Sequence, residues 1–411
     1  MSRTADPATA LDRWPDLRSV PRARFRATVA AALLRRTADR LGFGVEYPDG
    51  HRAGAPRPSP TLTLHRPESF LARVGAGGLI GFGEAYQAGD WDSDDLHGLL
   101  VRLAENAAGI VPAWLQWLRR FYVAAMPGSQ DNTRANAARN IGHHYDLSND
   151  LFGAFLDESM TYSSALFDGG QDLPAAQLRK MDRLLDATGV GPSTRLLEIG
   201  TGWGALAVRA AERGATVHTI TLSEQQLRGA EERVARAGLT DRVTIELRDY
   251  RDLDASRRYD AIVSVEMVEA VGERYWPGYF RLIDRILAPG GTAGVQSITM
   301  ADERLAATRR TYTWMHKYIF PGGLIPSIPA IQRVLERHTG LAIDSDLAFG
   351  PDYARTLDLW RHRFAEATGG LARRGFDDLF ARTWDFYLAY SQAGFTSGYL
   401  DVHQFTLRRK P

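Results

Sequence analysis

Two glutamates, Glu266 and Glu269, directly follow the run YDAIVSV, which has the composition of a buried strand. Ligands of open α/β sheets bind beyond the carboxyl ends of the strands, so reacting groups are expected at this position. A carboxylate can stabilise developing positive charge or accept a proton. If the chain turns helical there, a spacing of three residues puts both side chains on nearly the same face. The pair is therefore a candidate catalytic site, and capping of the helix start is the alternative reading.

A glycine turn follows an earlier strand-like run. LLEIGTGWGAL, residues 196–206, reads as a strand end, a turn with Gly200, Gly202 and Gly204, and the start of a helix. Glycine lets the backbone approach a ligand closely, and the helix start offers free N–H groups. The Gly-x-Gly-x-Gly spacing differs from the Gly-x-Gly-x-x-Gly of dinucleotide folds, which favours S-adenosylmethionine over NAD. Glu198 fits the acidic residue of a methyltransferase nucleotide loop, although a structural salt bridge would also explain it.

Asp249 and Tyr250 come after the third strand-like run, RVTIEL. At this position a carboxylate and a ring could flank the adenine of a nucleotide. A capped turn explains the same two residues equally well.

The elements that must position these residues alternate along the chain. Helical spacing separates several of the short apolar runs, which are RLLEIG, ATVHTITL, RVTIEL, YDAIVSV and GTAGVQSIT. Strands alternating with helices predict a doubly wound, mostly parallel sheet. Together with the glycine turn, this favours a Rossmann-like α/β fold of the class I S-adenosylmethionine-dependent methyltransferases. The preceding region mixes a helical run, a β-like alternation and a glycine-rich stretch, which predicts a smaller mixed α+β domain. We expect an N-terminal accessory domain at 1–126, which could face a lipid or a membrane, a polar linker at 127–140 and a methyltransferase domain at 141–411.

Composition excludes several classes of function. The 411 residues suggest two domains, and 50 basic against 49 acidic residues give a formal charge of +1, which offers no global field for nucleic acid. The absence of cysteine removes disulfides and thiolate chemistry, and is compatible with the cytoplasm. His143 and His144 have no further ligands at metal spacing, so no metal site is expected. No run reaches the length of a membrane span, so the protein could touch a membrane but should not cross one.

The stretch NIGHHYDLSNDLFGAFLDESMTYSSALF, residues 140–167, resembles the cyclopropane fatty acid synthase family, which includes the mycolic acid methyltransferases. The resemblance continues through LLEIGTGWG, TLSEQQ, SVEMVEAVG, KYIFPGGLIPS and DYARTLDLW, and covers about two thirds of the chain. It implies alkylation of a cis double bond in an acyl chain by S-adenosylmethionine, and therefore an acyl-chain site in the domain at 141–411. The cofactor contacts that it implies are Tyr162, Ser163, Gly200, Gly202, Gly204, Thr221, Gln226 and Tyr250.

Departures from the family pattern concern a bound bicarbonate ion. Cyclopropane-forming members hold it with a cysteine, a glutamate, a histidine, an isoleucine backbone and a tyrosine. Glu269, Ile298 and Tyr353 remain here, whereas the cysteine position is Ser164 and the histidine position is Gln296. Glu266 stands where many members have a small residue, and it would repel an anion. Bicarbonate is therefore doubtful, and we expect Glu266 or Glu269 to do its work directly. On this reading, Glu269→Gln should abolish turnover.

The resemblance is strongest to the branch linked to tuberculostearic acid, in which oleoyl chains of phospholipids become 10-methylene chains. A cyclopropane product remains the alternative. Aromatic residues between the fifth strand and the C-terminus could line an acyl channel, or could be plain core. Arg309, Arg310 and Lys317 could meet a phospholipid head group at an anionic membrane, or form a solvated face. These features predict a cytoplasmic protein, peripheral at the inner membrane face. A downstream reductase partner and a homo-oligomer stay open.

Two rival classes follow from the same residues. Ser164 and Gln296 motivate a catalytically silent lipid-binding homologue, since a fold does not guarantee a function. The retained glycine turn, Tyr162 and Glu269 oppose it. A small-molecule or nucleic-acid methyltransferase is the other rival, and the charge balance disfavours it.

Overall fold

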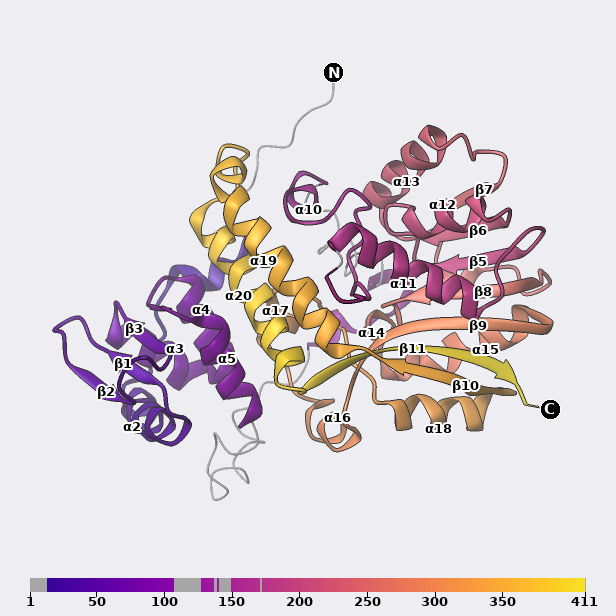
Figure 1. The fold of residues 1–411 in the computed structure, drawn as a ribbon. Helices are drawn as coiled ribbons and strands as arrows, with labels where there is room; N and C mark the ends of the chain where they lie inside the picture. Colours follow the sequence, from indigo (N-terminus) through magenta and orange to yellow (C-terminus); the bar gives the residue numbers. More distant parts are fainter. Residues whose placement is uncertain (1–12, 107–126, 137–138, 140–148, 171, 411) are drawn as a thin grey trace. The chain divides into compact units, whose positions relative to one another are not determined.

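The computed structural model describes residues 13–106, 127–136, 139, 149–170 and 172–410 (Figure 1). The chain divides into two compact units. Unit 1 contains Met1–Ala125, Thr311–Tyr318 and Leu357–Tyr399, and unit 2 contains Met126–Arg310, Ile319–Thr356 and Leu400–Pro411. No helix among the described residues is long and apolar enough to cross a bilayer.

Unit 2 is built on a seven-stranded sheet in the order β10-β11-β9-β8-β5-β6-β7. The strands are β5 (Arg195–Ile199), β6 (Thr216–Thr221), β7 (Val243–Leu247), β8 (Tyr259–Val265), β9 (Leu287–Met300), β10 (Leu341–Ala348) and β11 (Leu400–Arg409). Only β11 runs antiparallel to its neighbours, β9 and β10. This confirms the predicted doubly wound, mostly parallel fold.

Helices cover both faces of this sheet (Figure 1). Neighbouring residues of a strand point to opposite faces, so each strand packs against helices on both sides. Leu196 on β5 packs in a cluster with residues of α11 (Leu173–Ala187), α12 (Ala205–Glu212) and α13 (Glu224–Arg236). The next residue, Leu197, packs in a second cluster with α15 (Trp276–Ile286) and α18 (Ile328–His338). Both faces are therefore buried, as parallel sheets require. The shorter elements of this unit are η2 (Gly128–Gln130), α10 (Asn149–Phe155), η3 (Tyr250–Asp252), α14 (Val268–Val271), η4 (Glu273–Tyr275) and α16 (Asp302–Thr308).

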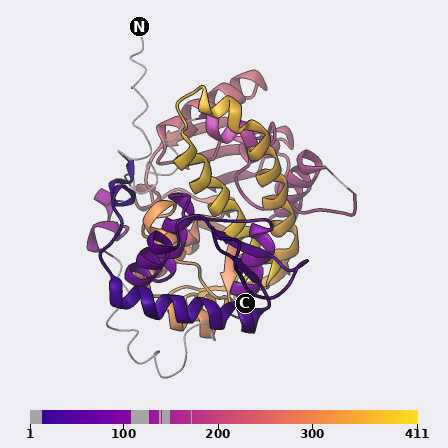
Figure 2. The same ribbon diagram turned by 90° about the vertical axis from the view of Figure 1, so that its left-hand side faces the viewer.

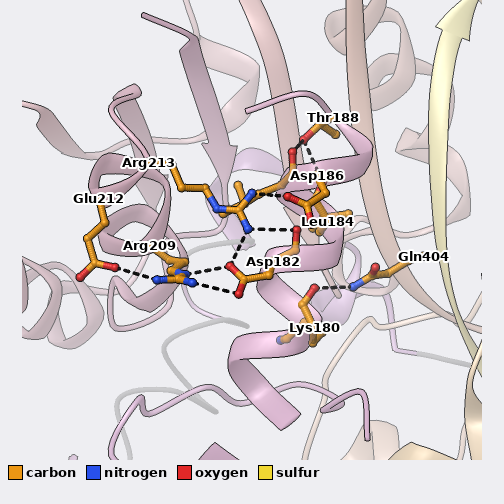
Figure 3. A network of polar contacts seen from close by, with 10 residues as sticks. Lys180, Asp182, Leu184, Asp186, Thr188, Arg209, Glu212, Arg213 and Gln404 are labelled. Carbon is orange, nitrogen blue, oxygen red and sulfur yellow. Dashed lines mark hydrogen bonds and ion pairs between the residues drawn. The ribbon is translucent and has the colours of Figure 1, made fainter. Parts of the chain in front are cut away.

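A polar network fixes α11 against α12 (Figure 3). Asp182 on α11 accepts hydrogen bonds from Arg209 at 2.7 Å and from Arg213 at 2.6 Å. Both guanidinium groups lower the pKa of Asp182, chiefly through the Arg209 hydrogen bond, so the carboxylate stays charged. On the same helix the backbone carbonyl of Lys180 accepts a hydrogen bond from Gln404 on β11. The helix that carries Lys180 is thus held by groups on two different elements.

Unit 1 contains a four-stranded sheet in the order β2-β1-β3-β4, with β1 and β3 parallel. Its N-terminal elements are η1 (Pro15–Arg18), α2 (Arg24–Leu41), β1 (Gly44–Glu46), β2 (Arg52–Gly54), β3 (Thr61–Leu64), α3 (Pro67–Gly77), α4 (Leu79–Gln87), β4 (Trp91–Ser93) and α5 (Leu96–Glu105). Later in the chain it gains α17 (Trp314–Tyr318), most of α19 (Gly350–Ala372) and α20 (Asp378–Thr396).

The division differs from the predicted one at these later segments. The first break, at Ala125, lies beside the predicted boundary, but 311–318 and 357–399 group with unit 1 and not with the methyltransferase unit. The indole of Trp314 donates to Gln87 at 2.8 Å, and Tyr86 donates to Asp385 at 2.6 Å. The ring of Phe386 packs against Trp314 at a centroid distance of 4.8 Å. Such aromatic residues are therefore core of unit 1.

Candidate active site

The carboxyl ends of β5 and β8 meet at the centre of the unit 2 sheet. Strand β5 pairs in parallel with β6 on one side and with β8 on the other. The strand order reverses at this point, where ligands of doubly wound sheets bind. The glycine turn follows β5, and Glu266 is the first residue after β8. Two regions far apart in the sequence thus come together at one edge.

The glycine turn has the backbone that its sequence suggested. Gly200, Gly202 and Gly204 all have positive φ, at 100°, 52° and 82°. A Cβ on Gly200 would stand 2.8 Å from Cγ of Met267, and the φ of 100° also favours glycine there. A Cβ on Gly202 would meet nothing within 4 Å. Open space over a glycine in this turn fits a nucleotide-type ligand lying against the backbone.

Glu198 lies buried at the end of β5, directly before the turn. Thr219 donates a hydrogen bond of 2.7 Å to its carboxylate. Burial raises the pKa of Glu198 to about 8, and the Thr219 bond and the charge of Lys180 oppose this rise. Among the described residues Glu198 forms no salt bridge. The structural salt bridge that the sequence left open therefore has no partner residue in that part of the chain.

Thr221 and Gln226 are joined directly at the end of β6. The Thr221 hydroxyl donates to the Gln226 side chain at 2.8 Å, and Ser223 caps α13 by accepting from the Gln226 backbone N–H. Both side chains are buried and lie on the two sides of a strand-to-helix turn. The turn is thereby held in one conformation.

Asp249 and Tyr250 form a capped turn. The Asp249 side chain accepts from the backbone N–H of Arg251 and pairs with its guanidinium at 2.6 Å. The pKa of Asp249 is lowered, because the Arg251 hydrogen bonds outweigh the effect of burial. Tyr250 packs edge-on against Tyr279, and burial raises its pKa to about 12. Asp249 thus has the role of the capped-turn alternative. The ring of Tyr250 lies at the carboxyl edge of the sheet, where it could still flank an adenine.

Tyr162 and Ser163 precede α11. The ring of Tyr162 meets Phe152 edge-on at a centroid distance of 5.1 Å. The hydroxyl of Ser163 accepts a hydrogen bond of 2.6 Å from Lys180, whose side chain is buried. Burial lowers the pKa of Lys180 to about 8, and the charges of Glu266, Asp157 and Glu198 act in the opposite direction.

Glu266 is surrounded by hydrogen-bond donors. One carboxylate oxygen accepts from the Ser164 backbone N–H at 3.0 Å and from Gln296 at 2.9 Å. The other oxygen accepts from the Tyr353 hydroxyl at 2.7 Å. Burial raises the pKa of Glu266, and these three donors together with the charge of Lys180 oppose the rise. The three donors favour the charged form of Glu266.

The backbone explains how Glu266 reaches these donors. Its φ is 53°, a left-handed conformation that is uncommon for a residue other than glycine. Its N–H still donates to the Gln296 carbonyl of β9 at 2.8 Å, and the helix α14 begins only at Val268. The condition for one shared helical face is therefore not met at Glu266. Glu266 lies before the helix and Glu269 within it.

Glu269 has a sparser environment. One oxygen accepts from Ser297 at 3.0 Å and from the Ile298 backbone N–H. The other oxygen is buried and has no hydrogen-bond partner in the described part of the chain. Burial raises the pKa of Glu269 to about 8, and the nearby charge of Glu266 adds to this effect. Two carboxyl groups that interact in this way do not both ionise readily near neutral pH.

Sequence reasoning missed Lys180, Gln404 and Arg183. Gln296 donates to Glu266 and accepts from Gln404 at 2.9 Å, and Gln404 accepts from Arg183 at 2.7 Å. This chain of bonds fixes the orientation of both amides. Lys180 carried a readable signal, because it occupies a position in the apolar stripe of α11 with Ala176, Met181 and Leu184.

No group of three or more metal-ligating side chains occurs in the residues that the structure covers. His143 and His144 lie outside the described residues, as do parts of the predicted 127–140 linker.

The sequence matches the family model for mycolic acid cyclopropane synthetase over residues 132–405. The chain belongs to this family. It is 51% identical to the tuberculostearic acid methyltransferase UfaA1 of Mycobacterium tuberculosis, over 100% of this chain and 98% of that protein. It is 33% identical to the cyclopropane-fatty-acyl-phospholipid synthase of Escherichia coli, over 83% and 86% of the two chains.

Among solved structures, the chain resembles the mycolic acid cyclopropane synthase CmaA1 complexed with SAH and CTAB. The TM-score is 0.61 at 31% identity, and the match covers 66% of this chain and 98% of that chain. The resemblance to the cyclopropane fatty acid synthase family, read from the sequence motifs, is therefore confirmed.

Proposed function

We propose that this family member methylates the cis double bond of an oleoyl-type phospholipid chain and converts that chain into a 10-methylene acyl chain. It is an S-adenosylmethionine-dependent fatty acyl methyltransferase. Its similarity to a tuberculostearic acid methyltransferase over the full length supports the 10-methylene product. The observation that carries the proposal is the Glu266 carboxylate, which accepts hydrogen bonds from Ser164, Gln296 and Tyr353.

The residues around the glycine turn fit S-adenosylmethionine. We assign its binding to the backbone at Gly200, Gly202 and Gly204, to Glu198, Thr221 and Gln226, and to Tyr162, Ser163 and Tyr250. When bound, the cofactor supplies an electrophilic methyl group on a positively charged sulfur. Asp249 acts on this site through the turn that it caps, since its carboxylate already pairs with Arg251.

The donors around Glu266 form an anion seat, by which we mean the Ser164 N–H, the Gln296 amide and the Tyr353 hydroxyl. In cyclopropane-forming relatives the corresponding positions are those that hold bicarbonate. Here one covalently attached carboxylate accepts from all three donors. A separate bicarbonate would have to displace Glu266 and would meet its charge, so it does not fit this arrangement. We derive no step through it.

Glu266 is the proton acceptor in this proposal. Its three donors and Lys180 favour the charged form, whereas Glu269 with a pKa of about 8 keeps its proton at neutral pH. A charged carboxylate stabilises the positive charge that develops on the acyl chain after methyl transfer. It then accepts the proton that leaves. This ranks Glu266 above Glu269, whereas the sequence alone singled out Glu269 for replacement.

Whether a hydride shift precedes the loss of the methyl proton decides the product. A hydride shift followed by loss of a proton from the new methyl group gives a methylene. Loss of that proton with ring closure gives a cyclopropane. In both cases the chain gains one CH2 and Glu266 gains one proton. Three hydrogen bonds hold the carboxylate that accepts this proton.

The test is mass spectrometry of oleoyl phospholipid after incubation with the protein and S-adenosylmethionine, in detergent micelles, with ozonolysis of the product. We expect a gain of one CH2 and a retained double bond. The same gain without a double bond means a cyclopropane and contradicts the proposed product. No gain, with cofactor still bound, means the catalytically silent homologue.

A further inference from the structure

Unit 1 exposes a group of large apolar side chains at the start of α2. Seven such side chains are exposed among the described residues, and three of them, Val20, Phe25 and Val29, lie within ten residues of one another. Phe25 is 82% exposed, the largest value of the seven. Single exposed apolar residues are normal on a surface, but a cluster of them usually marks a contact site.

The helix geometry places these side chains away from the core of unit 1. Phe25, Val29 and Ala32 are exposed and follow the i, i+4, i+7 spacing of one helical face. The buried residues of the helix are Ala30, Ala38 and Leu41. Figure 2 shows α2 as one continuous indigo helix. The outer face of the first turns of α2 is thus apolar, although its side chains do not contribute to the core of unit 1.

Arginines surround this face. The segment 17–38 contains six arginines and no acidic residue, although the whole chain carries a net charge of only +1. Arg22, Arg24 and Arg26 are exposed and form no ion pair in the part of the chain that the structure describes. By contrast, two of the cations that the sequence suggested for a head group are paired, since Lys317 contacts Glu84 and Arg309 contacts Glu273.

We propose that Val20, Arg22, Arg24, Phe25, Arg26 and Val29 form an α2 patch that docks on an anionic lipid bilayer. This inference rests on the proposed function, because the acyl substrate is then part of a membrane. Burial of phenylalanine and valine at the boundary between head groups and acyl chains is favourable, and the arginines can pair with lipid phosphates. A nucleic acid would match the charge and leave the apolar side chains exposed. A bilayer matches both.

The test is co-sedimentation of the full chain with dioleoyl phosphatidylcholine vesicles that contain dioleoyl phosphatidylglycerol. Two variants separate the two contributions. The triple variant Arg22→Gln, Arg24→Gln, Arg26→Gln should lose vesicle affinity by about tenfold or more at low salt, and the difference should shrink at high salt. The double variant Phe25→Ser, Val29→Ser should lose affinity at every salt concentration, because apolar insertion is not screened.

Matched controls lie elsewhere on the surface. The triple variant Arg285→Gln, Arg337→Gln, Arg373→Gln removes the same charge from exposed positions, and Leu178→Ser with Leu247→Ser removes exposed apolar side chains. Both should bind vesicles like the natural chain. The patch variants should also keep methyl transfer to oleoyl phospholipid in detergent micelles and lose it on vesicles.

Unchanged vesicle binding in both patch variants would overturn the inference. So would a change of oligomeric state in those variants, measured by analytical ultracentrifugation, because the patch would then join two copies of the chain. Failure of the natural chain to methylate lipid in micelles would contradict the proposed function instead. Vesicle binding is measured without turnover, so the two failures are distinguishable.

Discussion

Glu266 and Glu269 follow the same strand, three residues apart, and differ in the hydrogen-bond donors around them. Both oxygens of Glu266 accept hydrogen bonds, from a backbone N–H, an amide and a phenol. Glu269 has donors on one oxygen, and its second oxygen has no partner among the described residues. Burial alone therefore does not set the role of a carboxyl group. The donors decide which member of a buried pair carries the charge.

Replacement of Glu266 by glutamine should reduce turnover more than any other single replacement at the site. Glu266→Gln keeps the shape of the side chain and removes its charge, so the site loses both its stabilising anion and its proton acceptor. We expect turnover to fall by about 10³-fold, within the range for general bases. S-adenosylmethionine affinity, measured by calorimetry, should stay within several-fold. Turnover near that of the natural chain would indicate that Glu269, and not Glu266, is the proton acceptor.

Removal of the Tyr353 hydroxyl should have the next largest effect. Tyr353→Phe deletes one of the three donors to Glu266 and leaves the ring in place. A hydrogen bond to a charged group contributes about 1.5–3 kcal/mol, so kcat should fall by roughly 10- to 100-fold. Steady-state kinetics on micellar oleoyl phospholipid measures this. An unchanged kcat would mean that the tyrosine only packs.

Lys180 should act on the site through charge. Its ammonium lowers the pKa of Glu266, so Lys180→Met should raise that pKa. The acidic limb of the kcat/KM profile should therefore move to higher pH, with a loss of activity that higher pH recovers. Lys180→Arg keeps the charge and should restore the position of this limb. A uniform loss at all pH values in Lys180→Met would indicate a purely structural role.

Glu269→Gln should have the smallest effect on turnover, within about tenfold, because it exchanges one neutral hydrogen-bonding group for another. Stability should change with pH in a defined direction. The pKa of Glu269 rises from 4.5 to about 8 on folding, so the folded chain holds this proton and the unfolded chain releases it. Stability is then lost as pH rises from about 4.5 to about 8. Between pH 5 and pH 8, the Tm of Glu269→Gln should rise relative to the natural chain; a constant difference contradicts the raised pKa.

Sequence patterns were sufficient for the sheet and the cofactor edge. The runs RLLEIG, ATVHTITL, RVTIEL and YDAIVSV contain β5, β6, β7 and β8. The central strands β5 and β8 are mostly buried, so their runs are rich in apolar residues, whereas the edge strand β7 is partly exposed. The glycine turn was equally readable, since positive φ values such as those of its three glycines favour glycine. Local rules decide these features.

The anion seat could not be read in the same way. Tyr353 and Ser164 lie 87 and 102 residues from Glu266, and no local pattern reports such a contact. The left-handed backbone at Glu266 is also uncommon for its residue type. The grouping of 311–318 and 357–399 with unit 1 depends on side-chain contacts such as Trp314 with Gln87. Long-range packing decides these features.

The dependence of turnover on bicarbonate tests the central claim most directly, with the natural chain and Glu266→Gly compared in buffer depleted of carbon dioxide. Glycine tolerates the φ of 53° and leaves the donors of the anion seat without their carboxylate. We predict that the natural chain turns over at the same rate with and without bicarbonate, and that Glu266→Gly is inactive until bicarbonate is added. A natural chain that loses activity on depletion of bicarbonate would contradict the account.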